Sequence, residues 1–344
     1  MRKIAVDQTQ VKGRFNRYAQ FCVGAGRAGE GLRKTFQDQL EIARKECGFQ
    51  YLRFHGIFHE DMGVCRRDPD GQLVYNWQYV DILYDSLLEK GIRPFVELGF
   101  MPKVLASGEK TIFWWTSNVT LPADFQQWYD FIFAFVSHLE ERYGREEVLS
   151  WYFEIWNEPD IANFFLGTQQ DYYNLYAVTA KAVKAVCKDY RVGGPASANP
   201  AWVKQMIDYC DENGLPIDFT TSHCYGVEGY YDDRNGKSKL YLREEKDFSI
   251  KTLQGVKQDV IDSGHPDMEV HYTEWGPSYS SRDPVHDAYL AAPYVLYHLK
   301  QLDGYLDSIS YWTFTDIFEE ICPPPTPFHG GFGLINTQGL KRCV

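Results

Sequence analysis

Two glutamates, Glu158 and Glu274, each stand at the end of a run of residues that is typical of a buried β-strand. Glu158 follows the run 149–156 in the sequence Trp-Asn-Glu-Pro, and Glu274 lies near the end of the run 269–275. Glycoside hydrolysis needs such a pair of carboxyl groups, because one protonates the leaving oxygen while the other attacks the anomeric carbon or activates water. For a single buried glutamate, the alternative is a structural ion pair.

The residues around each glutamate suggest which role it has. Glu158 follows Asn157, whose amide is suited to bind the 2-hydroxyl of a sugar, so Glu158 is the candidate acid/base and its pKa is expected to be raised. Glu274 is then the candidate nucleophile. We expect it to be ionised and held by neighbours such as Tyr225 or Arg53.

The histidines allow a second kind of chemistry to be considered. His55 and His59 have the spacing of two metal ligands, but the His-x-His pair typical of barrel metallohydrolases is absent, so no metal is expected. His55 and His223 end predicted strands and are expected to orient carboxylates or sugar hydroxyls. The glycines of 24–29 match Gly-x-Gly-x-x-Gly but have no strand–helix–strand context, so no nucleotide cofactor is expected.

The elements that must position these residues alternate along the chain. Short β-rich runs occupy 21–25, 51–56, 93–99, 149–156, 191–194, 219–224, 269–275 and 308–315. Between them, apolar residues recur at helical spacing, as at Phe36, Leu40, Ala43 and Cys47. About eight such repeats predict an α/β fold, a (β/α)8 TIM barrel with its chemistry at the C-terminal strand ends. An open, doubly wound sheet is the alternative.

The composition excludes several classes of function. The 344 residues include 35 Lys and Arg against 47 Asp and Glu, a net charge of −12. An acidic chain with no basic run is not expected to bind nucleic acid or an anionic membrane, and no run approaches the roughly 18 apolar residues of a membrane span. The eight cysteines are scattered with no Cys-x-x-Cys, which predicts reduced thiols in a cytoplasmic protein.

From about residue 18 to residue 334 the sequence resembles the β-xylosidases of glycoside hydrolase family 39, which belong to clan A of the retaining glycosidases. The stretches that carry the resemblance are 23–27 (VGAGR), 51–56 (YLRFHG), 91–102 (GIRPFVELGFMP), 153–159 (FEIWNEP), 311–314 (YWTF) and 328–334 (FHGGFGL). The Asn-Glu-Pro signal is shared by the whole clan, whereas the set of stretches is specific to the family.

The resemblance implies a role for individual residues. It makes Glu158 the acid/base, Glu274 the nucleophile and Asn157 the ligand of the sugar 2-hydroxyl. Phe113 and Trp115 match the family's aromatic walls. The positions that match the subsite of the first sugar are His55, His223, Tyr225, Tyr279, Trp312, Glu319 and Glu320. The implied activity is that of a retaining exo-glycosidase, a β-D-xylosidase acting on xylo-oligosaccharides, with no cofactor and no metal.

The sequence departs from the family pattern beside the nucleophile. Residues 275–278 read Trp-Gly-Pro-Ser where the β-xylosidases have Tyr-Asn-Thr-Ser, and Cys224 replaces the usual alanine. These changes leave other sugars open, namely an arabinoside, a glucoside or an α-L-iduronide. Binding the carboxylate of an iduronide is disfavoured by the adjacent Glu319 and Glu320. A catalytically impaired sugar-binding protein and a metal-dependent hydrolase are the remaining alternatives.

The chain is also shorter than the family pattern. Members of the family continue through an eighth helix into a β-sandwich, which their N-terminal residues help to build. Here we expect an N-terminal segment at 1–17, a catalytic barrel at 18–335 and a short tail at 336–344, without a complete eighth helix or a sandwich. A seam left uncovered between the last and first strands would favour association into a homo-oligomer.

Overall fold

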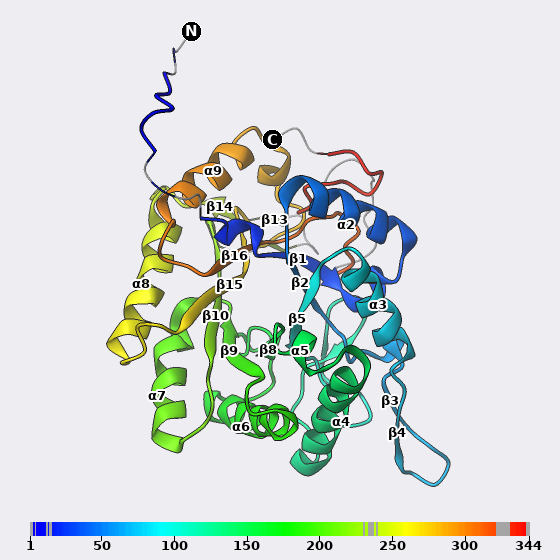
Figure 1. Ribbon diagram of the computed structural model, residues 1–344. Helices are drawn as coiled ribbons and strands as arrows, with labels where there is room; N and C mark the ends of the chain where they lie inside the picture. The colour runs from blue at the N-terminus through cyan, green and yellow to red at the C-terminus, as the bar shows by residue number, and fades with distance from the viewer. Residues whose placement is uncertain are drawn as a thin grey trace.

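The computed structural model describes residues 3, 5–11, 13, 16–229, 231–232, 237–238, 240–320 and 331–341. Eight strands in this part of the chain pair in parallel and close into a barrel (Figure 1). In chain order they are β1 (Cys22–Arg27), β2 (Tyr51–His55), β5 (Arg93–Leu98), β8 (Tyr152–Ile155), β9 (Arg191–Ser197), β10 (Phe219–Tyr225), β15 (Glu269–Gly276) and β16 (Ser308–Tyr311). The predicted (β/α)8 barrel is confirmed.

Helices surround the barrel and follow most of its strands (Figure 1). The longer ones are α2 (Lys34–Cys47), α3 (Gln78–Glu89), α4 (Phe125–Tyr143), α6 (Gln169–Val186), α7 (Val203–Asn213), α8 (Phe248–Asp262) and α9 (Ala291–Gln301). Local sequence sets their ends. Thr168 and Asp171 form a capping box at the start of α6, and Gly48 follows α2 at φ 80°, a left-handed conformation that favours glycine.

Shorter elements fill the connections. The short helices are α1 (Ala28–Gly31), α5 (Arg145–Val148), η1 (Tyr18–Gln20), η2 (Glu60–Met62), η3 (Pro200–Trp202) and η4 (Pro284–Asp287). Two-stranded sheets pair β3 (Cys65–Arg67) with β4 (Leu73–Tyr75), β6 (Thr111–Ile112) with β7 (Ser117–Asn118), β11 (Val227–Glu228) with β14 (Tyr241–Leu242), and β12 (Tyr231–Asp232) with β13 (Lys237–Ser238). Most of these elements lie in the loops that follow barrel strands.

Aromatic rings fill the end of the barrel where its strands begin. Tyr51, Phe95, Tyr152 and Phe219 form one buried cluster with Cys22. The rings of Phe95 and Tyr152 are stacked with centroids 4.9 Å apart. Because this end is filled, the opposite end, where the strands terminate, is left for a site, as is general for this fold.

The seam between the first and last strands is narrow. β1 and β16 pair at Val23 and Tyr311, and Tyr18 of η1 helps to cover the seam, because its hydroxyl donates to Leu299 O at 2.6 Å. In 312–320 and 331–341 no helix follows β16. Residues 321–330, which include the start of the 328–334 motif, lie outside the described residues. The division into three segments stays a prediction.

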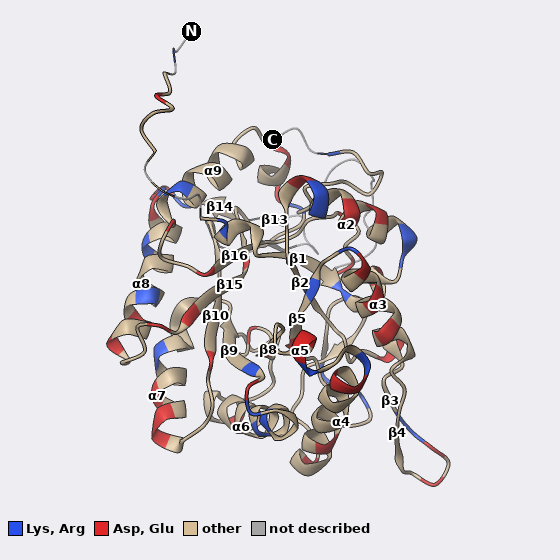
Figure 2. Cartoon of the chain, in the orientation of Figure 1, with Lys and Arg blue, Asp and Glu red and all other residues tan. Residues whose placement is uncertain are grey.

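The distribution of charged side chains on the surface agrees with the composition, which contains no basic run. Figure 2 shows basic and acidic residues interspersed on the outer helices, with no basic stripe among the described residues.

Apolar side chains beside and on α9 are exposed, notably Tyr289 at 84% and Leu296 at 68%. Association through them stays a prediction. Within the described part of the chain, no helix has the length and apolar character needed to span a membrane.

The cysteines in the described ranges are unpaired. Cys22, Cys187, Cys210 and Cys224 are buried, and Cys47 and Cys65 are partly buried. Burial raises the pKa of the Cys22, Cys210 and Cys224 thiols to about 12. These thiols are therefore protonated core residues, as the sequence predicted for them.

Candidate active site

The polar residues that end the barrel strands meet around one cavity of about 980 Å³. Parallel strands of a closed barrel all terminate at the same face, so side chains far apart in sequence converge there. Residues from six of the eight strands or the loops after them line this cavity, among them His55, Asn157, Glu158, Tyr225, Glu274 and Trp312. The two candidate glutamates thus share one site.

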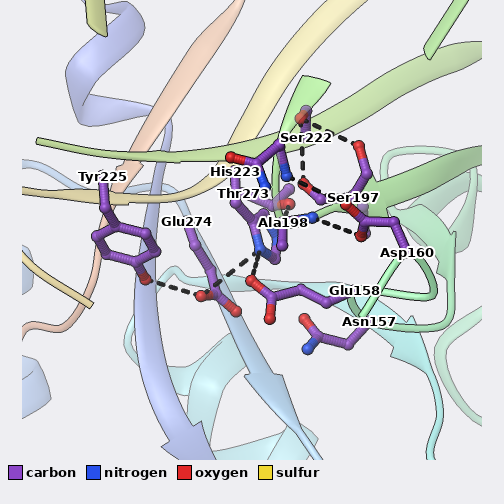
Figure 3. A network of polar contacts seen from close by, with 12 residues as sticks. Asn157, Glu158, Asp160, Ser197, Ala198, Ser222, His223, Tyr225, Thr273 and Glu274 are labelled. Atoms are coloured by element: carbon purple, nitrogen blue, oxygen red, sulfur yellow. Dashed lines mark hydrogen bonds and ion pairs between the residues drawn. The ribbon is translucent and has the colours of Figure 1, made fainter. Parts of the chain in front are cut away.

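The two carboxyl groups lie close enough for a double displacement. A carboxylate oxygen of Glu158, one of Glu274 and a ring nitrogen of His223 all lie within 4.8 Å of one another (Figure 3). Retaining glycosidases hold their carboxyl groups about 5–5.5 Å apart, whereas inverting enzymes need about 6.5–9.5 Å to admit a water. The spacing therefore fits retention.

Glu274 is held by two donors. Arg53 Nη1 lies 2.6 Å from its Oε1, and the Tyr225 hydroxyl donates to its Oε2 at 2.8 Å (Figure 3 shows the tyrosine). Both partners were expected from the sequence. A carboxylate with a guanidinium on one oxygen and a hydroxyl on the other is stabilised as an anion and fixed in orientation, as a nucleophile requires.

Glu158 has the opposite surroundings. Glu158 is 8% exposed, and burial together with the charge of Asp160 raises the pKa of its carboxyl group to about 8. At neutral pH the carboxyl group is therefore protonated, as an acid catalyst must be before bond cleavage. Trp156 and Glu158 adopt left-handed φ values of 71° and 47°, and Glu158 N donates to Ala196 O at 2.8 Å. Such strained backbone is typical of functional sites.

Besides Glu274, Arg53 binds three other residues beneath the site. It is fully buried, its Nε donates to Glu154 at 2.8 Å, and its Nη2 lies 2.9 Å from Glu97 and 2.8 Å from Asn157 Oδ1. Because Arg53 occupies the amide oxygen of Asn157, the amide nitrogen is left to donate to a ligand. Glu97 and Glu154 were not predicted as site residues. Each is an acidic residue inside an otherwise apolar strand, and this pattern could have indicated that they belong to the site.

His55 is a neutral hydrogen-bonding group on the floor of the cavity. Its Nδ1 lies 2.7 Å from Glu97 Oε2, and its Nε2 lies 3.6 Å from Glu274 and 3.8 Å from Glu320. Burial and then the charge of Arg53 lower the pKa of His55 to about 3. Its ring also contacts Trp312, with centroids 4.9 Å apart. His55 thus lies beside three glutamates, and its predicted role in orienting carboxylates or sugar hydroxyls stays a prediction.

The remaining predicted site residues fall into two groups. Tyr279, Trp312 and Glu320 line the cavity. His223 and three others are not among its lining residues: Phe113, Trp115 and Glu319.

Phe113 and Trp115 pack behind the cavity wall, whereas Glu319 pairs with two arginines. The Phe113 ring stacks between His55 at 5.7 Å and Trp115 at 5.2 Å, forming a layer behind the wall. Glu319 turns to Arg27 at 3.2 Å and Arg33 at 2.6 Å.

Other lining residues come from loops that sequence reasoning did not single out. Asn163 and Phe164 follow the Asn-Glu-Pro motif, and residues 198–201 follow β9. Five residues of α8 also line the cavity: Phe248, Thr252, Gly255, Val256 and Asp259. These loops and this helix carry no sequence motif, so only the folded structure reveals that they line the cavity.

The donor set suits acid/base chemistry better than a cation. Glu158, His223 and Glu274 are spaced closely enough to surround an ion, but the Arg53 guanidinium already neutralises Glu274 at 2.6 Å and would repel a cation. His59, the sequence partner of His55, instead lies 2.8 Å from Asp61.

The Gly-x-Gly-x-x-Gly run is explained by packing. A Cβ added at Gly24 would lie 2.4 Å from the Trp312 ring, and one at Gly26 would lie 2.4 Å from Glu30. Both glycines are required because large side chains approach the backbone closely. Packing against the Trp312 ring and Glu30 therefore accounts for Gly24 and Gly26.

Known proteins match this chain along nearly its whole length. The family model for glycosyl hydrolases family 39 matches residues 2–344. The chain is 42% identical over 343 residues to the β-xylosidase of Geobacillus stearothermophilus, covering 96% of this chain and 67% of that protein.

Solved structures of the same family superpose closely. The GH39 enzyme from Xanthomonas axonopodis pv. citri has a TM-score of 0.92 and 46% identity, covering 95% of this chain and 65% of that one. A monomeric β-xylosidase from Caulobacter crescentus has a TM-score of 0.94 and 41% identity, covering 97% of this chain and 68% of that one. The chain thus spans about two thirds of the length of these relatives. It belongs to family 39 of the glycosyl hydrolases.

Proposed function

We propose that the protein is a retaining exo-acting β-D-xylosidase that releases xylose from xylo-oligosaccharides. The observation that carries this proposal is the pair of carboxyl groups within 4.8 Å, with Glu274 held as an anion by Arg53 and Tyr225. Glu158 is held protonated by burial. Two carboxyl groups with such different surroundings provide a nucleophile and an acid in one site.

The first step forms a covalent intermediate. A carboxylate oxygen of Glu274 attacks the anomeric carbon, and the bond from that carbon to the leaving oxygen breaks. Glu158 gives its proton to the leaving oxygen, so the shortened oligosaccharide departs as a neutral alcohol. The xylosyl unit remains joined to Glu274 as an ester, and Glu158 is left as a carboxylate.

The second step returns the enzyme to its starting state. Glu158 takes a proton from water, and the water oxygen attacks the anomeric carbon of the ester. The bond to Glu274 breaks, and xylose leaves with the configuration of the substrate. Arg53 and Tyr225 stabilise the carboxylate that is released, because both hydrogen-bond to it.

The lining of the cavity suggests which side holds which part of the substrate. His55, Trp312 and Glu320 lie on the side of Glu274, whereas Asn163, Phe164 and Asn199 come from loops beside Glu158. The acid must stand next to the leaving oxygen, so the terminal sugar is placed against the first group. The leaving group is then placed against the second.

The charge of the site favours a neutral sugar. Among the described residues that line the cavity, Arg243 is the one arginine or lysine, and its Nη1 already lies 2.7 Å from Glu228. Arg53 is saturated by the carboxylates beneath the site. A carboxylate on the substrate would find no unpaired cation among these described residues, which argues against an iduronide. Similarity to two β-xylosidases supports xylose over arabinose or glucose.

The test is a panel of nitrophenyl glycosides with the purified protein, comprising β-xyloside, α-L-arabinoside, β-glucoside and α-L-iduronide. We expect the xyloside to have the highest kcat/KM, and proton NMR to detect β-xylose as the first product. Faster turnover of another glycoside would reassign the sugar, and α-xylose as the first product would exclude retention. Binding of xylo-oligosaccharides without turnover would support the sugar-binding alternative.

A further inference from the structure

A buried chain of hydrogen bonds runs away from the acid/base beneath the cavity. Glu158 Oε1 lies 2.8 Å from His223 Nδ1, and His223 Nε2 lies 3.2 Å from Thr273 Oγ1 (Figure 3). The Thr273 hydroxyl donates in turn to Glu154 Oε1 at 2.7 Å. His223, Thr273 and Glu154 are all fully buried, so water does not compete for these contacts.

These hydrogen bonds all run in one direction from donor to acceptor, and Glu154 sets that direction. Glu154 is paired through its Oε2 with Arg53 Nε at 2.8 Å, and a carboxylate can only accept hydrogen bonds. The single hydroxyl hydrogen of Thr273 therefore points to Glu154. The Thr273 oxygen is then left to accept, and the group that faces it is His223 Nε2, so Nε2 carries the ring proton.

This tautomer decides the state of Glu158. A neutral His223 with its proton on Nε2 presents a lone pair at Nδ1, 2.8 Å from Glu158 Oε1. Two acceptors at that distance repel each other unless a proton lies between them, so the proton belongs to Glu158. We propose that Thr273 and Glu154 are positioning residues that fix the His223 tautomer and thereby keep Glu158 protonated in the free enzyme, a role that rests on the proposed glycosidase function.

The neutral state of His223 agrees with this assignment. Burial lowers the pKa of His223 to about 4, so the ring is neutral at neutral pH. Besides His223, the charged or titratable groups that face Glu158 are Arg53, Glu97, Asp160, Tyr225, Glu274 and Glu320, and Glu274 Oε2 also lies 3.6 Å from His223 Nδ1. Asp160 accepts hydrogen bonds from the backbone amides of Ala198 and Asn199. Neither of these bonds involves His223, Thr273 or Glu154.

The same arrangement serves both chemical steps. Before cleavage it keeps the proton on Glu158, which rotates its carboxyl group to deliver the proton to the leaving oxygen. After cleavage, the lone pair of His223 Nδ1 faces an ionised Glu158 and makes that carboxylate a stronger base toward water. Neither Thr273 nor Glu154 is among the residues that line the cavity, so neither is expected to contact the substrate.

The first test is Thr273→Val, which removes the hydroxyl at nearly constant volume. His223 is then free to move its proton to Nδ1 and donate to an ionised Glu158, so the pKa of Glu158 falls. We expect the alkaline limb of kcat/KM, measured with an aryl xyloside whose phenol is a poor leaving group, to move down by about one pH unit. Thr273→Ser keeps the hydroxyl and is expected to keep the limb at the wild-type pH.

A second variant reverses the direction of these hydrogen bonds instead of removing one of them. In Glu154→Gln the amide oxygen must face the Arg53 donor, so the amide nitrogen donates to Thr273. The Thr273 hydroxyl then turns toward His223 Nε2, and the ring proton moves to Nδ1. We expect the alkaline limb to move in the same direction as in Thr273→Val, although the substituted group differs.

The tautomer itself is read by nitrogen NMR of the wild-type protein labelled at histidine, with the His223 signals identified by their loss in His223→Gln. We expect a protonated Nε2 and an unprotonated Nδ1. A protonated Nδ1 in the wild type, or an alkaline limb that moves in neither variant, would overturn it. This spectrum needs no substrate, so it decides the tautomer even if the protein hydrolyses none of the glycosides.

Discussion

At the scale of single residues, the two glutamates are distinguished by what surrounds them. Glu274 receives hydrogen bonds from a guanidinium and a hydroxyl, whereas Glu158 is buried beside Asp160 and a neutral histidine. Burial without a cation in contact raises the pKa of a carboxyl group, and contact with a cation favours the anion. The proposed roles of Glu274 as nucleophile and Glu158 as acid therefore agree with their neighbours.

Removal of the acid gives the first prediction. Glu158→Ala should lower kcat by roughly 10²–10⁴-fold for xylosides with poor leaving groups, because proton donation is lost. Xylosides with good leaving groups should still form the intermediate on Glu274, and azide should then restore turnover and yield β-xylosyl azide. A variant whose turnover ignores azide would place the acid/base elsewhere.

The same residue links stability to pH. Because the folded pKa of Glu158 is about 8 against an ordinary 4.5, its contribution to stability is complete below pH 4.5 and is lost as the pH rises through 8. Glu158→Gln cannot ionise, and its amide can donate to His223. We expect it to unfold at a higher temperature than the wild type above about pH 8, with a gap that narrows toward about pH 5.

The control for this experiment is Glu146→Gln, the same substitution at an exposed position. It should shift the thermal midpoint equally at all pH values. A Glu158→Gln variant that follows the control would mean that Glu158 is ionised in the folded protein at neutral pH.

The sequence predicted part of this site. Glu158, Glu274, Arg53 and Tyr225 were found because each belongs to a predicted strand or its end. Glu154, Glu97 and Thr273 were not, since a polar residue within a strand can face the barrel interior or a helix, and the choice depends on register. The directions of hydrogen bonds appear only once side chains from different strands meet.

At the scale of elements, glycines mark places where backbones come too close for a side chain. Gly193 of β9 lies against β10, and a Cβ there would lie 2.3 Å from Phe219 O. Gly255 of α8 has no heavy atom within 4 Å of such a Cβ. The two positions therefore form a matched pair.

We expect Gly193→Ala to destabilise the protein by roughly 1–3 kcal/mol or more, because backbone cannot move aside as a side chain can. Gly255→Ala should stabilise it by up to about 1 kcal/mol through helix propensity. Denaturant unfolding measures both. Equal effects of the two substitutions would contradict the spacing of β9 and β10.

The types of all eight strands were predictable, but their limits were less so. The run 149–156 contains β8 at Tyr152–Ile155, because residues 149–151 close the turn after α5. The run 308–315 contains β16 at Ser308–Tyr311, after which the backbone pairs irregularly with neighbouring strands. Such endings depend on contacts with other strands, and apolar patterning does not record them.

At the scale of the whole molecule, barrel closure depends on contacts between the two ends of the chain. Gln39 of α2 is buried, donates to Asn336 O at 2.9 Å and accepts from the Thr315 hydroxyl at 2.5 Å. Glu319 N also donates to Glu30 at 2.8 Å. These contacts reinforce the narrow pairing of β1 with β16.

Gln39→Met keeps the size of the side chain and removes both hydrogen bonds. We expect a loss of about 2–3 kcal/mol in unfolding free energy, because two buried polar partners are left unsatisfied. Amides of β1 and β16 should exchange faster with solvent deuterium. Gln258→Met, on the exposed face of α8, is the control and should change stability by less than about 0.5 kcal/mol. Equal stability of the two variants would contradict this role of Gln39.

We propose that the whole retaining reaction depends on a covalent bond between Glu274 and the sugar. The most direct measurement is incubation with a deoxyfluoro β-xyloside bearing a good leaving group, followed by mass spectrometry of the peptides. We expect one added deoxyfluoroxylosyl group, located on Glu274, and slow loss of the label when a xyloside acceptor is added. A label on another residue, or hydrolysis with no label and with inverted product, would contradict it.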